Sequence, residues 1–147
     1  LNWSVRPSLL LGATLGLLES EYVDYQYGDR NLDGREQASA PPYQYSLSAE
    51  WTSGRGWMAR ADVLGCAPFY FDTSNDQRSN AYTLVNLKAG YESGRWSVYA
   101  WGRNVFDEKY AVRGFYFGLE PPDFADKLYI QRGDPRLAGV TFTWSVL

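Results

Sequence analysis

Apolar and polar side chains alternate with a period of two along most of this sequence, and this pattern constrains the fold more than any other feature. Residues 43–52 give the clearest case, with Tyr, Leu, Ala or Trp at every odd position and Gln, Ser, Glu or Thr at every even one. Successive side chains of a strand point to opposite faces of a sheet. The segment therefore predicts a strand with one apolar face and one wet face.

The same alternation predicts strands over residues 57–64, 84–91, 96–103, 110–119 and 138–146, and residues 1–5 read as the end of a further strand. Residues 8–18 also read as a strand, although apolar side chains on both faces leave a buried helix open as an alternative. Gly12 and Gly16 favour the strand because glycine weakens a helix. In strands 84–91 and 96–103 the apolar face is less clear, since the latter carries aromatic residues on both faces.

The connections between these strands differ in length. Residues 53–56 and 92–95 are short and contain glycine and serine, so they predict tight hairpin turns. Residues 19–42, 72–80 and 120–135 predict long loops. Uneven connections of this kind are typical of outer-membrane β-barrels.

Composition separates a membrane barrel from its main rival, a soluble antiparallel sandwich or barrel. Mean hydropathy is −0.41. In a membrane barrel the polar residues that face the lumen alternate with the apolar ones that face lipid and lower this mean, so the value does not exclude a membrane protein. Aromatic residues make up 17% of the chain, which suits a barrel with aromatic girdles. A soluble β-core would use bulky aliphatic residues, whereas the apolar faces here mix Ala and Gly with Leu, and Ile130 is the one isoleucine.

Charged side chains in the middle of the strands support the same interpretation. Glu50, Arg60, Asp62 and Lys88 fall on the faces opposite the apolar ones. A water-filled lumen permits such charges to pair or to line a channel, so they are candidates for the lumen-facing surface. The predicted fold class is all-β, an antiparallel transmembrane β-barrel segment of about 7–8 strands.

Charge and residue content exclude several functions. The net charge of −3 gives no support for nucleic-acid binding through a basic surface. The chain has no histidine, which removes His-dependent nucleophile triads and His-based zinc sites. Nothing singles out a nucleophile beside a carboxylate or lysine base, so we expect neither enzyme activity nor a cofactor.

A weak metal-site candidate lies in residues 29–34. Asp29, Asn31 and Asp33 match the front half of a calcium loop, D-x-N-x-D-G. The twelfth position of that loop, which should supply a bidentate carboxylate, is Ala40. A solvated turn is therefore the favoured interpretation, and no metal is predicted.

Residues 101–110 contain the most specific motif. The run Trp101-Gly102-Arg103-Asn104-Val105-Phe106-Asp107-Glu108-Lys109-Tyr110 resembles the W-G-x-N-L-F-D-x-x-Y stretch of TonB-dependent outer-membrane receptors. Residues 82–91, 133–136 and 139–142, and the run Ala40-Pro41-Pro42-Tyr43, also resemble parts of that family. The resemblance covers nearly the whole chain, in order and at fitting spacing.

Within this motif, Asn104 and Asp107 are expected to bond nearby backbone groups and to fix a tight reversal between strands. Val105, Phe106 and Tyr110 would give that turn an apolar anchor. A structural turn explains the pattern far better than a catalytic role for Asp107.

The resemblance implies a barrel of about 22 strands, of which residues 1–147 form the C-terminal portion, while the plug domain lies outside this chain. It implies an outer-membrane receptor of a Gram-negative bacterium that takes up a scarce nutrient, such as a ferric siderophore or cobalamin, energised through TonB. The implied partners are outer-membrane lipid, the remaining barrel strands, the plug, the TonB complex acting through a missing N-terminal region, and an unknown small-molecule ligand. A small free-standing outer-membrane β-barrel with a structural or adhesive role is the alternative.

Receptors of this family catch ligands with aromatic-lined loops, and one aromatic and acidic stretch fits that description. Its aromatic members are Phe115, Tyr116, Phe117, Phe124 and Tyr129. We expect these residues to contact the ligand. A packed loop or an aromatic girdle would explain them equally well.

The side of the membrane follows from counting strands. With a periplasmic C-terminus, the count places the turn at residues 104–109 in the periplasm and the tight turns at Gly54 and Gly94 outside. The long loops 19–42 and 72–80 then fall in the periplasm. This outcome is contrary to the usual rule that short turns are periplasmic.

Overall fold

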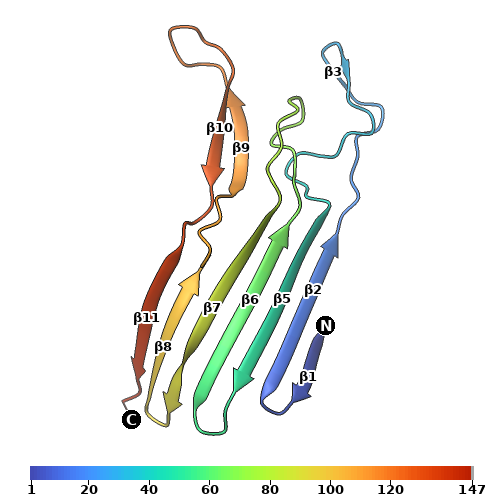
Figure 1. The fold of residues 1–147 in the computed structure, drawn as a ribbon. Coiled ribbons are helices and arrows are strands. Elements are labelled where there is room, and N and C mark those ends of the chain that lie inside the picture. The colour runs from blue at the N-terminus through green and yellow to red at the C-terminus, as the bar shows by residue number, and fades with distance from the viewer. Residues whose placement is uncertain (147) are drawn as a thin grey trace.

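The computed structural model describes residues 1–146 and contains no helix, and hence none long and apolar enough to cross a membrane, in the part described. Seven strands form one antiparallel sheet (Figure 1). In spatial order they are β1 (Asn2–Arg6), β2 (Leu9–Leu17), β5 (Tyr43–Thr52), β6 (Trp57–Cys66), β7 (Tyr82–Ser93), β8 (Trp96–Arg103) and β11 (Leu137–Trp144). Outside this sheet, β3 (Gln26–Tyr27) pairs with β4 (Arg30–Asn31), and β9 (Ala111–Phe117) pairs with β10 (Lys127–Arg132).

The predicted strands are confirmed to within a few residues at their ends. Residues 8–18 contain the strand β2 rather than a helix, as the two glycines indicated. The strands β2, β5, β6 and β7 have 9, 10, 10 and 12 residues. The lengths of β2, β5 and β6 match the ~9–11 residues with which a tilted strand crosses a bilayer, and β7 is slightly longer.

The register of the sheet divides its side chains into two faces. On one face Leu47 lies opposite Ala13 and Val63, and on the other Glu50 lies opposite Leu10 and Arg60. The first face, here called the apolar face, continues across the sheet through alanine, leucine, valine and aromatic residues. The second, the polar face, carries most of the Ser, Thr, Asn and charged side chains of the strands.

The same register shows which face of β7 and β8 is the apolar one. Ala100 lies opposite Ala89 and Val140, so Trp96 and Val98 share the apolar face with it. Trp101 lies opposite Lys88 and therefore belongs to the polar face.

Large aromatic residues of the apolar face gather at the end of the sheet that carries the tight turns. The ring of Tyr91 lies 5.1 Å from that of Trp57 and 5.5 Å from that of Trp96. Trp51 and Trp144, at the same ends of their strands, are exposed. A row of exposed aromatic residues at one height is what an interfacial girdle requires.

Residues 104–109 do not reverse the chain, so that prediction is wrong. The strand β9 runs onward in the direction of β8, and β10 leads back into β11, so β8 to β11 form one long hairpin (Figure 1). The predicted loop 120–135 accordingly contains β10. The predicted strand 110–119 exists as β9, but it pairs with β10 and adds no strand to the main sheet.

This topology also shows that the predicted sides of the loops, which rested on counting strands, are wrong. The tight turns at residues 7–8, 53–56 and 94–95 lie at the same end of the sheet as the C-terminal end of β11, and all the long connections lie at the other end (Figure 1). The error came from counting β9 as a strand that crosses the sheet. When β9 is left out of the count, the short connections lie at one end of the sheet and the long ones at the other, as in outer-membrane barrels.

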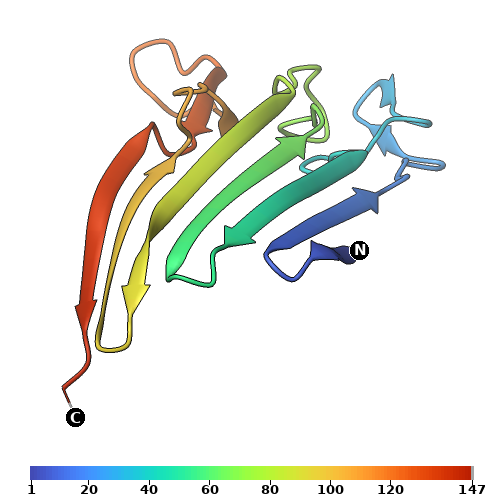
Figure 2. The same ribbon diagram turned by 60° about the horizontal axis from the view of Figure 1, so that its bottom comes forward.

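The sheet is curved and open (Figure 2). Its outermost strands β1 and β11 each have one neighbour, and they lie at opposite edges rather than against each other. An unpaired strand edge in lipid leaves backbone groups unsatisfied at several kcal/mol each. The sheet therefore needs further strands on both edges before it can enter a membrane.

Candidate functional site

The polar face carries a compact ion network at its centre. Arg60 Nη1 lies 2.9 Å from Glu50 Oε2, and Arg60 Nη2 lies 2.7 Å from Asp62 Oδ1. The pair Glu50 and Arg60 face each other across β5 and β6, whereas Asp62 follows Arg60 by two residues on the same strand. Because these side chains remain about one-third exposed, each pair stabilises the sheet only modestly.

Lys88 lies on the same face but outside that network. It faces Arg60 across β6 and β7, and its Nζ lies 3.8 Å from the centroid of the Tyr99 ring. The Tyr99 hydroxyl in turn donates a hydrogen bond to Glu92. The aromatic ring thus takes up the cation that would otherwise oppose Arg60. Tyr99 and Glu92 were missed at the sequence level, although their place in the alternation could have shown them.

The hairpin of β9 and β10 brings together part of the predicted ligand-contact set. The Phe115 and Tyr129 rings are stacked at 5.6 Å, and Phe117 meets Tyr129 edge-on at 6.5 Å. Arg113, which the sequence did not single out, lies with its guanidinium carbon 5.8 Å from the centroid of the Phe115 ring. One face of the hairpin therefore offers two exposed rings, Phe115 and Phe117, and the half-buried ring of Tyr129 beside a cation.

The other two members of the set lie elsewhere. Tyr116 alternates with Phe115 and Phe117 and so points to the opposite face of the hairpin, where it pairs with Leu128. Phe124 lies in the connection between the strands, is 60% exposed and has a φ of 51°.

The opposite face of the hairpin is packed against residues 67–81. Phe69, Phe71 and Cys66 form a buried cluster, and Leu128 and Ala111 of the hairpin pack against it. Gly114 makes this contact feasible, because a Cβ there would lie 2.4 Å from the Phe71 ring. This cluster holds the aromatic face of the hairpin outward.

Asn104 is the centre of the junction between β8 and β9. Its side chain is buried, its Nδ2 donates to the main-chain oxygens of Glu108 and Asp134 at 3.0 Å, and its Oδ1 accepts from Glu108 N at 2.9 Å. Its own main-chain N–H donates to Asn86 Oδ1 at 3.0 Å. The predicted backbone bonds are present, but they fix an offset between two strand segments instead of a reversal.

Asp107 completes the same junction. Its Oδ1 accepts from Arg136 N at 2.9 Å, and its Oδ2 lies 2.8 Å from Lys109 Nζ. Asp107, like Asn104, has a positive φ, of 55°. Asparagine and aspartate tolerate this conformation better than other residues with a Cβ, which explains their use here.

The apolar residues of the motif lie in three different environments. Val105 borders a groove on the apolar face, and the ring of Tyr110 packs at a tilt of 38° against that of Tyr82, with ring centroids 4.5 Å apart. Phe106 is 76% exposed and anchors nothing within the described residues.

The residues of the calcium-loop candidate act as caps of a small turn. Asn31 Oδ1 accepts from Asp33 N at 2.9 Å, and Asp33 Oδ1 accepts from Tyr25 N at 2.7 Å. Asp29 lies in the turn between β3 and β4. In residues 1–146, no group of three or more His, Cys, Asp or Glu residues is placed to hold a metal ion.

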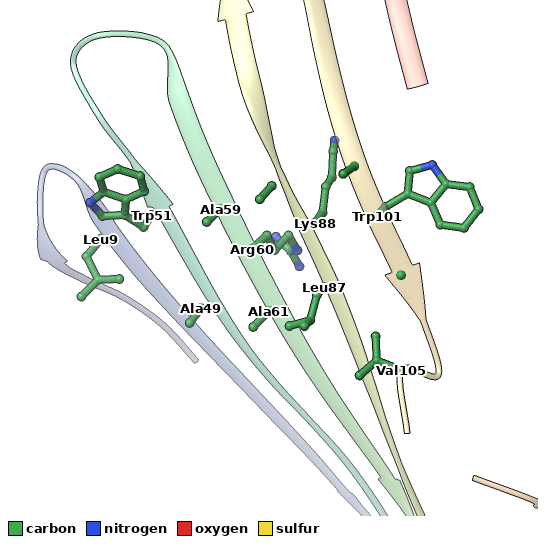
Figure 3. Close-up of a pocket in the computed structure, with 13 residues that line it drawn as sticks. Leu9, Ala49, Trp51, Ala59, Arg60, Ala61, Leu87, Lys88, Trp101 and Val105 are labelled. Carbon is green, nitrogen blue, oxygen red and sulfur yellow. The ribbon is translucent and has the colours of Figure 1, made fainter. Parts of the chain in front are cut away.

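A hollow of about 610 Å³ lies on the apolar face (Figure 3). Alanine side chains form its floor, and they are Ala49, Ala59, Ala61, Ala89 and Ala100. Leu9 and Trp51 stand at one end, and Leu87 and Val105 at the other (Figure 3). Arg60 and Lys88 also border it, but the register gives their side chains to the polar face. A groove with this lining fits hydrocarbon chains and offers little to a polar ligand.

Comparison with known proteins gives a family and a fold. A family model described as the β-barrel of TonB dependent receptor-like proteins matches residues 1–105. The structure is similar to that of the ferric yersiniabactin uptake receptor FyuA from Yersinia pestis, with a TM-score of 0.82 and 20% identity over 99% of this chain and 22% of that one. It is also similar to that of the siderophore receptor PiuA from Acinetobacter baumannii, with a TM-score of 0.76 and 14% identity over 96% of this chain and 20% of that one. The chain thus spans about a fifth of the length of these receptors.

Proposed function

The chain belongs to the family of TonB-dependent receptor-like β-barrels, and we propose that it forms the C-terminal part of a receptor that imports a scarce nutrient. The chain is an outer-membrane component of a Gram-negative bacterium, and its family consists of receptors and transporters rather than enzymes. The ligand we propose is a ferric siderophore or cobalamin, with import energised through TonB. Residues 1–147 would supply the last strands of a barrel of about 22.

The separation of the sheet into two faces carries this proposal. Lipid would meet the apolar face, where Leu47, Val63 and Ala49 alternate with residues of the other face. The polar face, with Arg60 between Glu50 and Asp62, would line a lumen that holds water and the plug domain. The charges of that network, about one-third exposed, have hydrogen-bonding capacity left for plug side chains.

The open edges of the sheet are evidence that the other strands of a larger barrel are partners of this chain. The strands β1 and β11 each need a neighbour, and the other barrel strands would provide it. A small free-standing barrel made of this chain alone would require β1 and β11 to pair with each other. They lie at opposite edges of the sheet, so the structure favours the larger assembly.

The long connections would face the outside, where the ligand arrives. The exposed face of the β9–β10 hairpin offers Phe115, Phe117 and Tyr129 with Arg113 beside them. Rings and a cation of this kind suit a large ligand with flat, electron-rich groups and negative charge. The solved receptors with this fold include two siderophore receptors, which supports the choice of ligand class.

An uptake assay of the full-length protein tests the proposal. The protein is expressed in a bacterium without other siderophore receptors, and uptake of labelled ferric siderophores and cobalamin is measured with and without TonB. We expect TonB-dependent uptake of one of these ligands. Uptake that is unchanged without TonB, or no uptake of any such ligand by correctly inserted protein, would contradict the proposal.

A further inference from the structure

Residues 19–42, here called the flap loop, fold into a small unit of their own. Tyr22 N donates to Arg35 O and Gly34 N donates to Tyr22 O, both at 2.9 Å, which closes the loop on itself. The rings of Tyr22 and Tyr25 stack at 4.8 Å, and Leu32 is only 4% exposed. A loop with internal bonds and a buried leucine moves as one piece rather than residue by residue.

Residues 67–81, here called the wall loop, are fixed to the end of the sheet. Ala67 N donates to Tyr43 O at 3.0 Å at the base of the loop. Farther along, Phe69 and Phe71 are buried in the cluster that packs on the β9–β10 hairpin over Gly114. Apolar burial therefore attaches the wall loop to the barrel end.

The flap loop contacts the tip of the wall loop through charge. Asp76 Oδ1 lies 2.7 Å from Arg35 Nη1 and 3.1 Å from Arg30 Nη2. The same two arginines donate to the main-chain oxygens of Asn75 and Ser74. One carboxylate of the wall loop thus holds two arginines of the flap loop.

A second group of contacts lies beside Tyr70 of the wall loop. The guanidinium carbons of Arg35 and Arg78 lie 4.1 and 4.4 Å from the centroid of its ring. Arg78 also pairs with Glu36 of the flap loop at 2.5 Å, and Ser39 N donates to Tyr70 O at 2.8 Å. These contacts are polar or cation–π, in contrast to the apolar cluster on the other side of the wall loop.

The two sides of the wall loop should respond differently to the solvent. Asp76 is 73% exposed and Arg30 is 50% exposed, so salt screens their attraction, whereas it leaves apolar burial intact. In the closed position Arg35 is nine-tenths buried and its Nε has no hydrogen-bond partner in the part of the chain described. Opening would hydrate that group, and the free energy gained by its hydration would offset part of the free energy lost with the ion pairs.

We propose that the flap loop is a lid that opens as one piece, with Asp76 as its latch and ionic strength as its control. The wall loop and the β9–β10 hairpin stay in place while the lid moves. The inference goes beyond the proposed import function and holds for any ligand, because it concerns contacts between the loops alone.

Hydrogen exchange of the full-length protein in outer-membrane vesicles tests the latch without any ligand. In the Asp76→Asn variant, we expect exchange of residues 22–35 to rise roughly five- to thirtyfold, while residues 67–71 and 111–117 keep their protection. Raising NaCl from about 0.02 M to about 0.5 M should produce a smaller rise in the unmodified protein, because salt screens the buried Arg35 less than the exposed Arg30. The variant should respond to salt less than the unmodified protein, since only the pair of Arg78 and Glu36 remains to be screened.

The matched control is Asp134→Asn, which removes an exposed carboxylate 3.6 Å from Arg103, away from the flap loop. It should leave exchange of residues 22–35 unchanged. Flap exchange that responds to neither salt nor Asp76→Asn would overturn the latch. A wall loop that loses protection together with the flap loop would overturn the lid as a separate moving piece. Neither result depends on uptake, so failure of the latch and failure of the import function are distinguishable.

Discussion

The side-chain amide of Asn104 donates a 3.0 Å hydrogen bond to the main-chain oxygen of Asp134, which joins the end of β8 to the segment that enters β11. The two residues are 30 positions apart, and the whole β9–β10 hairpin lies between them. This bond closes the base of the hairpin. The hairpin can therefore project beyond the sheet without splaying the β8–β11 pair.

Replacing Asn104 should destabilise the barrel at this junction. Asn104→Ala leaves the oxygens of Glu108 and Asp134 without their donor and places alanine at a φ of 46°. We expect a loss of about 2–4 kcal/mol, because buried groups left unsatisfied cost about 1–3 kcal/mol each. Urea unfolding of the full-length barrel measures the loss. The control Asn31→Ala, at an exposed turn, should cost under about 1 kcal/mol, and equal losses for the two variants would refute the role of Asn104.

Filling the space at Gly114 should open the cluster beneath the hairpin. Gly114→Ala places a methyl group 2.4 Å from the Phe71 ring, which must then move away from Cys66. Overpacking of this kind costs about 1–3 kcal/mol. Labelling of the Cys66 thiol by a maleimide reports the change, and we expect it to become faster. Gly94→Ala, where a Cβ meets nothing within 4 Å, should leave the labelling rate unchanged.

Reversing the central charge of the polar face should lower the free energy of unfolding, and a second charge reversal opposite it should restore most of the loss. Arg60→Glu places three carboxylates together, with Glu50 directly opposite on β5. We expect a loss of about 1 kcal/mol, since like charges facing each other across strands destabilise a sheet by that order. Adding Glu50→Lys should recover most of it. Additive losses in the double variant, measured by urea unfolding, would show that the two side chains do not interact.

The latch of the flap loop should be insensitive to pH until strongly acid conditions. Hydrogen bonds from Arg35 and Arg30 hold the pKa of Asp76 below its ordinary value of 3.8. A depressed pKa stabilises the closed position above the ordinary value, and that contribution is lost as pH falls through the depressed one. Exchange of residues 22–35, corrected for intrinsic rates, should be equal at about pH 7 and pH 5 and rise only below about pH 4.

Glu36, paired with Arg78, is the other carboxylate between the two loops, so Asp76→Asn serves as the control for this pH response. The variant should lose most of the acid response. A transition near neutral pH, or an unchanged acid response in Asp76→Asn, would assign the release to other groups.

The strands of the main sheet could be predicted because each is encoded locally. In residues 43–52 the alternation alone fixes the strand, its two faces and its ends, and the structure agrees. The grouping of Glu50, Arg60, Asp62 and Lys88 on one face followed from the same alternation.

The path of the chain after Arg103 could not be predicted in the same way. Alternation identifies a strand but not its partner, so β9 looked like a strand of the main sheet although it pairs with β10. The six residues of β10 lie between proline-containing segments and resemble a loop. The contact between Arg35 and Asp76 joins residues 41 positions apart across two loops, and no local pattern encodes it.

Spin-label accessibility shows whether the sheet stands in lipid with its apolar face outward, as we propose. In a Cys66→Ser form of the full-length protein, Leu47→Cys and Ala49→Cys report the apolar face, and Ser48→Cys and Glu50→Cys the polar face. In native membranes we predict that labels at 47 and 49 are reached by oxygen and shielded from a water-soluble nickel complex, with the alternation reversing at 48 and 50. Equal access of the nickel complex to both faces would mean that the apolar face does not stand in lipid.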